Sequence, residues 1–334
     1  MNRRKFSKSA GLGFLSLYGI VYGCSFAPEK EEKASKINAE KIFTPFFKLS
    51  LAQWSLHKSI QEGGMDPFDF AKSAKKMGFE GLEYVSGLYE PFLEKQSSSL
   101  AGMKAMSNKL IQASKIEGIE NVLIMVDGEG DLGIQDKKKR LEGVENHHKW
   151  VDMAKEIGCH SIRLNLFGEG SKEAQIDASA DSMVRIGDYA KDMGINILVE
   201  NHGGFSSDPN WVVKVMKKAN RSNVGTLPDF GNFCIEREGG ERWGAPCINE
   251  YPDVYQAVKL MMPYAKAVSA KSYEFDKNGN ETKIDYYKML KVVKDAGYKG
   301  YIGVEYEGGE DEEKGILATK NLLLNAAKKI KDEN

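Results

Sequence analysis

The chain has 334 residues, of which 47 are basic and 48 are acidic, so its formal net charge is −1 at pH 7. Hydrophobic residues make up 41% and charged residues 28%, the composition of an ordinary globular protein that is long enough to bury a core. Without a surplus of basic residues, the chain shows no sign of a nucleic-acid partner.

The first 24 residues have the pattern of an export signal. Their basic start, RRKFSK at 3–8, resembles a twin-arginine signal, and the apolar run after it is too short to span a bilayer. The run ends in VYGC (21–24), which resembles a lipobox and would make Cys24 the lipidated first residue of the mature protein. An ordinary signal peptide, or a cytoplasmic protein with an apolar start, is the alternative.

We therefore expect an exported protein that a lipid anchor at Cys24 holds to a membrane, in the periplasm or at the outer membrane of a Gram-negative bacterium. Residues 25–45 are charged and poor in apolar residues, so they are predicted to form a flexible tether. Residues 46–334 show no internal boundary and are predicted to form a single catalytic domain.

One pattern recurs throughout this domain. A short apolar run ends in polar residues, a stretch with helical spacing follows, and a glycine precedes the next run. Eight such runs predict an α/β fold with a parallel sheet, and the count of eight favours a closed (β/α)8 TIM barrel over an open doubly wound sheet. No GxGxxG follows the first run, so a dinucleotide site lacks its main support. The runs cover 49–57, 79–86, 119–127, 159–167, 195–202, 223–232, 266–275 and 300–308.

Three carboxylates end apolar runs where a strand by itself would favour Val or Ile. These are Glu200, Asp229 and Glu305, and in a barrel the carboxyl ends of the strands meet at one face. Burying three negative charges together is costly unless a cation neutralises them, and oxygen ligands favour Mn²⁺ or Mg²⁺ over Zn²⁺. The alternative is that each carboxylate pairs with a Lys or Arg at the mouth of the barrel.

Four short motifs close predicted strands in order: VEN (199–201), PDFGN (228–232), SAK (269–271) and VEYEG (304–308). Together they resemble the xylose isomerase-like TIM barrels, which include the sugar phosphate isomerase/epimerase group with ketose 3-epimerases and inosose dehydratase. The resemblance covers about 46–330. It implies that Glu200, Asp229 and Glu305 hold a divalent metal.

The chain departs from this family at two positions. The family often has a histidine as the fourth metal ligand on the seventh strand, where this chain has Ser269. Ser269, a water molecule or His202 would then complete the shell, or the metal would be bound weakly. The family's Asp-x-x-His on the sixth strand is Asp229-Phe-Gly-Asn232 here, which places the usual substrate in question.

The resemblance implies proton removal next to a carbonyl, through an enediolate that the metal stabilises. Glu200 and Glu305 are the expected acid and base, and Lys271 could stabilise an oxyanion or instead form an ion pair with Glu83 or Asp229. We expect His202 to bind a sugar hydroxyl or act as a second acid. The wider expected set of substrate-binding residues is His202, His57, Trp54, Glu83, Arg163 and Asn232. For Trp54 a barrel cap, and for Arg163 a structural carboxylate partner, are the alternatives.

We therefore expect a metal-dependent isomerase or epimerase that acts on a sugar or keto-sugar. A lyase or dehydratase on a 3-keto sugar or glycoside would use the same residues, and a non-catalytic carbohydrate-binding lipoprotein with a decayed metal site is the alternative from another class. An abasic-site endonuclease shares the fold but needs a histidine-rich zinc cluster, and only five histidines are present.

The segment 233–250 is longer than a usual strand-to-helix connection and is predicted to form a lid that carries Trp243. Cys234 and Cys247 flank its Gly-rich part and could form a disulfide in an exported protein. Cys159 is expected in the core, and the adjacent His147 and His148 are expected to be structural.

Overall fold

The computed structural model describes residues 43–333, so the predicted export signal and lipid-anchor cysteine, and nearly all of the tether, lie outside the described residues. Eight parallel strands form one sheet in the order β6-β5-β4-β3-β2-β1-β10-β9. Each of the eight predicted apolar runs overlaps one of these strands, and seven of them contain it entirely. Their bounds are β1 Lys48–Ala52, β2 Gly81–Val85, β3 Glu120–Met125, β4 Ser161–Leu164, β5 Asn196–Glu200, β6 Val224–Leu227, β9 Val268–Ser272 and β10 Tyr301–Tyr306.

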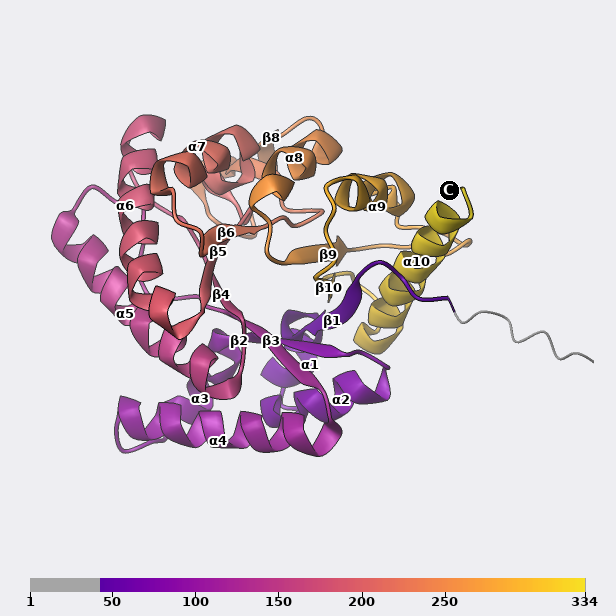
Figure 1. Ribbon diagram of the computed structural model, residues 1–334, viewed down its shortest axis with the longest axis horizontal. Helices are drawn as coiled ribbons and strands as arrows, with labels where there is room; N and C mark the ends of the chain where they lie inside the picture. The colour runs from indigo at the N-terminus through magenta and orange to yellow at the C-terminus, as the bar shows by residue number, and fades with distance from the viewer. Residues whose placement is uncertain (1–42, 334) are drawn as a thin grey trace, which may run out of the picture. The chain divides into compact units, whose positions relative to one another are not determined.

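The two edge strands of this sheet, β6 and β9, meet at isolated parallel bridges. Thr226 pairs with Ala265 and Asp229 with Ser269. The Ser269 N–H donates to the Pro228 carbonyl at 3.0 Å, and the Phe230 N–H donates to the Ser269 carbonyl at 3.1 Å. The strands thus form a ring around one axis, and the TIM-barrel prediction is confirmed (Figure 1).

Helices surround the strands (Figure 1). Ser or Asp caps open the long helices by accepting backbone N–H groups, as Ser98, Asp136 and Asp208 do. Predicted glycine stops are confirmed, for Gly158 follows α5 with a φ of 83°. The α-helices are α1 His57–Gln61, α2 Phe70–Lys76, α3 Glu90–Leu93, α4 Ser99–Glu117, α5 Lys137–Ile157, α6 Lys172–Ala190, α7 Pro209–Ala219, α8 Val254–Met261, α9 Tyr286–Asp295 and α10 Glu312–Asp332.

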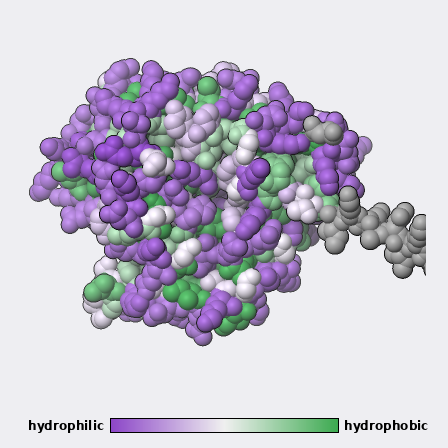
Figure 2. Space-filling view, viewed as in Figure 1, coloured by the Kyte–Doolittle hydropathy of each residue, from purple (hydrophilic) through white to green (hydrophobic). Residues whose placement is uncertain are grey.

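The core lies between this ring of helices and the strands. Helix α7 shows how it forms, because Trp211, Val212, Val215 and Met216 recur at helical spacing and are all buried. Burying each such side chain stabilises the fold by roughly 1.5–3 kcal/mol. Cys159 is buried as predicted. On the face of the molecule that Figure 2 shows, hydrophilic residues cover much of the surface.

The connection after β6 contains a short antiparallel hairpin, where the sequence predicts only a lid loop. Strands β7 (Cys234–Arg237) and β8 (Cys247–Glu250) pair, and a disulfide joins Cys234 to Cys247. The possible disulfide is therefore present. We call residues 233–250 the lid hairpin. Among residues 43–333, no helix is both long and apolar enough to cross a membrane.

Candidate active site

The three predicted carboxylates lie together at the carboxyl ends of the strands. Glu200 is the last residue of β5, Asp229 follows β6, and Glu305 lies near the end of β10. Glu200 pairs with Leu227, two residues before Asp229, and Glu305 pairs with Lys271, two residues after the Ser269 that pairs with Asp229. One oxygen of each lies within 4.8 Å of the others, and all three side chains are buried.

Two basic side chains and one hydroxyl contact this cluster. Arg163 Nε lies 2.8 Å from Glu200 Oε2, and Lys271 Nζ lies 3.0 Å from Glu305 Oε1. Ser269 Oγ lies 2.7 Å from Asp229 Oδ2 and 2.9 Å from Glu305 Oε2, so it can donate to one of them at a time. Ser269 thereby bridges two of the carboxylates.

The cluster fits a divalent cation. The alternative of carboxylates paired with basic residues holds for Glu200 and Glu305, but among the described residues no Lys or Arg forms an ion pair with Asp229. Glu200 Oε2 is buried without a hydrogen-bond donor despite its contact with Arg163. Three carboxylates against two cations leave a net negative charge in a site shielded from water, which a bound cation would neutralise.

Without such a cation, the carboxyl groups differ in their proton affinity. Burial raises the pKa of Asp229 to about 7 and raises the pKa of Glu200 well above its usual range. Burial would also raise the pKa of Glu305, but the charge and hydrogen bond of Lys271 hold it below its usual value. The same site therefore offers one protonated and one ionised glutamate.

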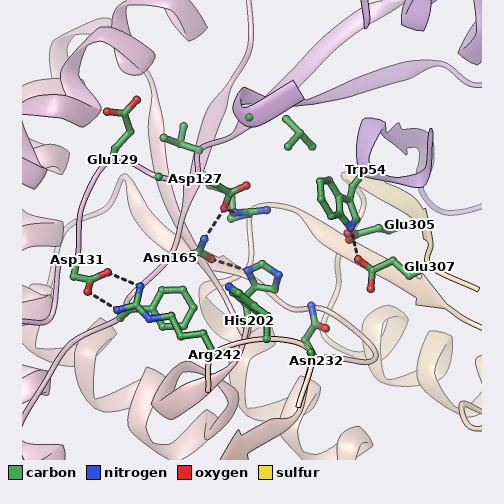
Figure 3. A pocket seen from close by; sticks show the side chains of 18 of the residues that line it. Trp54, Asp127, Glu129, Asp131, Asn165, His202, Asn232, Arg242, Glu305 and Glu307 are labelled. Atoms are coloured by element: carbon green, nitrogen blue, oxygen red, sulfur yellow. Dashed lines mark hydrogen bonds and ion pairs between the residues drawn. The ribbon is translucent and has the colours of Figure 1, made fainter. Parts of the chain in front are cut away.

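A chain of hydrogen bonds fixes the tautomer of His202 (Figure 3). Arg163 Nη1 and Asn165 Nδ2 both donate to Asp127 Oδ1, at 2.7 and 2.6 Å. Asn165 Oδ1 is then left to accept from His202 Nδ1 at 2.8 Å. Burial, followed by the charges of Arg163 and Lys271, lowers the pKa of His202 to about 3. His202 is thus a neutral imidazole whose Nε2 can accept a hydrogen bond.

A cavity of about 890 Å³ lies above the carboxylates, with Glu305 on its wall. Four of the residues predicted to bind substrate line it, namely His202, Trp54, Asn232 and Arg163. Trp54 Nε1 donates to Glu307 Oε1, on the side of the cavity opposite Asp131 and Arg242 (Figure 3).

Residues 71–326 match the family of xylose isomerase-like TIM barrels. The chain belongs to this family.

Solved structures share the fold at low sequence identity. A 3-keto-D-glucoside 4-epimerase from E. coli is 15% identical with a TM-score of 0.59, over 78% of this chain and 94% of that one. An IOLI protein with a zinc atom is 15% identical with a TM-score of 0.59, over 85% of this chain and 99% of that one.

A third structure, a xylose isomerase-like TIM barrel protein from Mycobacterium smegmatis in complex with magnesium, is 14% identical with a TM-score of 0.60, over 86% of this chain and 99% of that one.

Two curated proteins match a short stretch of this chain. The 3'-dehydrocarminate deglycosidase alpha subunit of Microbacterium sp is 37% identical over 81 residues, and the C-glycoside deglycosidase alpha subunit of Arthrobacter globiformis is 32% identical over 73. The first match covers 22% of this chain and 22% of the Microbacterium protein. The second covers 20% of this chain and 21% of the Arthrobacter protein.

Two residues predicted to bind substrate do not line the cavity. Glu83 is fully buried inside the barrel, where Ser50 Oγ donates to its Oε1 at 2.6 Å. A Cβ at Gly303 would come within 2.4 Å of Glu83 Oε2, so only glycine leaves room for this carboxyl. His57 stacks on Trp54 with ring centroids 4.4 Å apart, and therefore supports a cavity residue.

Glu83 makes the stability of the barrel depend on pH. Burial raises its folded-state pKa from 4.5 to about 8, so the folded protein keeps a proton that the unfolded chain releases above pH 4.5. Stability is therefore lost as pH rises from 4.5 through 8. Glu83→Gln, which imitates the protonated acid, is expected to remove this loss and to stabilise the protein by on the order of 3 kcal/mol at pH 7.

Urea unfolding at pH 5 and pH 8 tests this expectation. The variant should gain stability over the wild type at pH 8 and little at pH 5. A wild-type advantage that grows with pH would contradict a protonated Glu83. The exposed Glu80→Gln serves as the control for a change of one surface charge.

Several cavity residues are absent from the predicted set. Asp127, Asn165, Phe167 and Arg242 line the cavity, and so does His147, which was expected to be purely structural. Its Nδ1 bonds the Gly143 carbonyl at 2.6 Å. Asn201, the residue after Glu200, is fully buried. It holds β6 in place, accepting from the Asp229 N–H at 2.7 Å.

The lid hairpin closes one side of the cavity. Arg242 makes an ion pair with Asp131, at 2.9 Å between Nη1 and Oδ1, and Trp243 contacts His202 with ring centroids 4.5 Å apart. A disulfide across 13 residues stabilises a structure by about 3 kcal/mol through the loop it closes, whereas a half-exposed ion pair gives about 0.2–1 kcal/mol. The disulfide is therefore the main constraint on the hairpin.

We expect the Cys234→Ser/Cys247→Ser double variant to be cut by trypsin after Arg237 or Arg242 at least tenfold faster than the oxidised wild type. Mass spectrometry of the fragments locates the cuts. Wild-type protein in reductant should behave as the double variant does, while cleavage within the barrel helices stays unchanged. Equal cleavage of oxidised wild type and variant would show that other contacts hold the hairpin.

Proposed function

We propose that this chain is a metal-dependent enzyme that removes a proton next to the carbonyl of a sugar or keto-sugar, as an isomerase or epimerase. One observation carries the proposal. Glu200 and Glu305 lie together with Asp229, and Glu305 lines a cavity whose other walls carry sugar-binding types of side chain. Acid–base work on both faces of a carbon needs such a pair.

Glu200, Asp229 and Glu305 are the residues that would hold the cation, and Mn²⁺ or Mg²⁺ suits their oxygen atoms better than Zn²⁺. When bound, the cation would polarise the substrate carbonyl as a Lewis acid. Ser269 keeps two of the ligands in place, and its hydroxyl remains available as a fourth oxygen.

The chain's own residues position the substrate and move the proton. An ionised glutamate accepts the proton, and a protonated one supplies it on the opposite face. Lys271, fully charged between Glu305 and Glu307, places positive charge where the enediolate develops. His202 Nε2 accepts a hydrogen bond from a sugar hydroxyl, since Asn165 fixes its tautomer.

The curated matches favour a second candidate, β-elimination from a 3-keto glycoside, because both are named deglycosidase subunits. In this reaction a glutamate removes the proton from C2, the C1–C2 double bond forms, and the bond from C1 to the leaving group breaks. A protonated side chain then gives its proton to the leaving group. The same Glu200 and Glu305 serve both reactions.

Product analysis separates the two candidates. The purified protein is incubated with Mn²⁺ and glucosides oxidised to the ketone at C3, and the products are followed by NMR. An epimerase yields a new sugar stereoisomer with the glycosidic bond intact. A lyase yields free aglycone and an unsaturated sugar. Unchanged substrates, together with unchanged free ketoses, would contradict both.

We also propose that the protein is exported and lipid-anchored at Cys24, on the strength of its N-terminal sequence. Its substrate would then be unphosphorylated, because phosphorylated sugars are made and kept inside cells. Cys24→Ala should move the protein from the membrane fraction to the soluble fraction of the producing cells. Retention of the variant in the membrane fraction would contradict the anchor.

Metal binding distinguishes an enzyme from a carbohydrate binder with a decayed site. We expect Mn²⁺ at about 100 times its dissociation constant to stabilise the metal-stripped protein by about 2.7 kcal/mol, measured as a rise in melting temperature. Asp229→Asn should abolish the rise, whereas Asp131→Asn, on the lid side of the cavity, should retain it. A wild type that shows no rise with Mn²⁺, Mg²⁺ or Zn²⁺ would favour the binder.

A further inference from the structure

The cavity has more room than one sugar ring needs. Its volume of about 890 Å³ lies near the top of the roughly 300–1,000 Å³ range of cavities that take drug-sized ligands. A single ring placed over Glu305 would leave the lid side of the cavity filled with water. The size therefore indicates a ligand with a second part.

The two sides of the cavity differ in chemistry (Figure 3). Over the carboxylates, His202, Asn232 and Glu307 offer polar atoms, and Trp54 offers a ring whose other face is covered by His57. A polar wall with one aromatic face suits the hydroxyl groups and C–H face of a sugar ring.

The lid side combines the charged Glu129, Asp131 and Arg242 with aromatic surface. Trp243 is 47% exposed although it lies against His202 and packs edge-on against Phe167, with ring centroids 5.5 Å apart. The guanidinium of Arg242 lies 4.6 Å from the Phe167 ring centre and is engaged with Asp131, while Arg237 donates to the Ala245 carbonyl at 2.8 Å. An indole held half-exposed on a disulfide-closed hairpin is a preorganised contact for an apolar ring.

We propose that the cavity binds a two-part ligand, a glycoside whose sugar lies over Glu305 and whose aromatic aglycone packs on Trp243 beneath the lid hairpin. This inference rests on the proposed function for the sugar, and adds the aglycone site. It identifies the substrate class as aryl glycosides rather than free monosaccharides.

Calorimetric binding of phenyl and methyl glucosides, in both anomeric forms, tests the aglycone site. These compounds carry no ketone and cannot be turned over, so binding is measured apart from catalysis. The wild type should bind at least one phenyl glucoside about tenfold more tightly than the methyl glucoside of the same anomer. Trp243→Ala should remove this difference.

Ile248→Ala is the matched control, because Ile248 is exposed on the same hairpin and does not line the cavity. It should bind as the wild type does. Equal affinity for phenyl and methyl glucosides, or a preference that survives in Trp243→Ala, would overturn the aglycone site. Aryl binding without any turnover of keto-glucosides would instead overturn the proposed reaction and leave this site standing.

Discussion

Glu200→Gln and Glu305→Gln are each expected to lower the rate of proton exchange next to the substrate carbonyl by 10²–10⁴-fold. A positioned general acid or base contributes about this factor, and an amide can neither accept nor supply the proton. Both side chains are buried, and Glu305 lines the cavity, so water cannot readily take their place. The measurement is the loss of the substrate's proton signal in deuterated water.

Glu274→Gln is the control for this pair. Glu274 follows β9, the strand that carries Lys271, but it is exposed, does not line the cavity and is not one of the three clustered carboxylates. We expect less than a tenfold loss. The metal content of each variant is measured alongside, since a metal-free variant would be inactive for that reason alone. Exchange within tenfold of the wild type in both Gln variants, with metal bound, would contradict the assigned acid and base.

Arg163→Met is expected to destabilise the fold by about 3–5 kcal/mol, because it removes one partner of a buried network. The Arg163 side chain is 4% exposed, and its guanidinium holds Glu200 at 2.8 Å and Asp127 at 2.7 Å. In the variant these carboxylates either stay charged without a partner or take up protons. Urea unfolding of the metal-free protein measures the loss.

This loss should depend on pH. Burial already raises the pKa of Glu200, and without Arg163 it rises further, so the folded variant binds a proton that the unfolded chain does not hold at neutral pH. The penalty from Glu200 should therefore grow only as pH rises above the raised pKa that Glu200 has in the wild type, because below it both folded proteins hold the proton. Arg185→Met, which removes the half-exposed ion pair with Asp181, should cost less than about 1 kcal/mol. Similar losses for the two variants would show that Arg163 does not neutralise the site.

Local patterns predict the strands and the three carboxylates for a simple reason. A strand buried on both faces needs a continuous apolar run, and a charged residue such as Asp229 at its end is visible in the sequence. Parallel barrel strands bring all such ends to one face, so Glu200, Asp229 and Glu305 could be placed together without coordinates.

The height of a polar residue along its strand decides whether the residue reaches the active site or stays inside the barrel, and the sequence does not show this height. Glu83 and Glu200 both lie in predicted strands, yet Glu83 lies beneath the cavity inside the barrel. The hydrogen bonds from Arg163 and Asn165 to Asp127 join residues 36 and 38 positions apart on neighbouring strands, and they depend on strand register. For the pairing of β7 with β8, the sequence contains one local indication, the two cysteines Cys234 and Cys247.

The central claim is that the protein removes a proton next to the carbonyl of a sugar. The most direct measurement is NMR of free ketoses and 3-keto glucosides incubated with the Mn²⁺-loaded wild type in deuterated water. Deuterium incorporation next to the carbonyl, in at least one of these compounds and absent with Glu200→Gln, is the predicted result. Incorporation that continues unchanged in Glu200→Gln and Glu305→Gln, or its absence from every compound with metal bound, would contradict the claim.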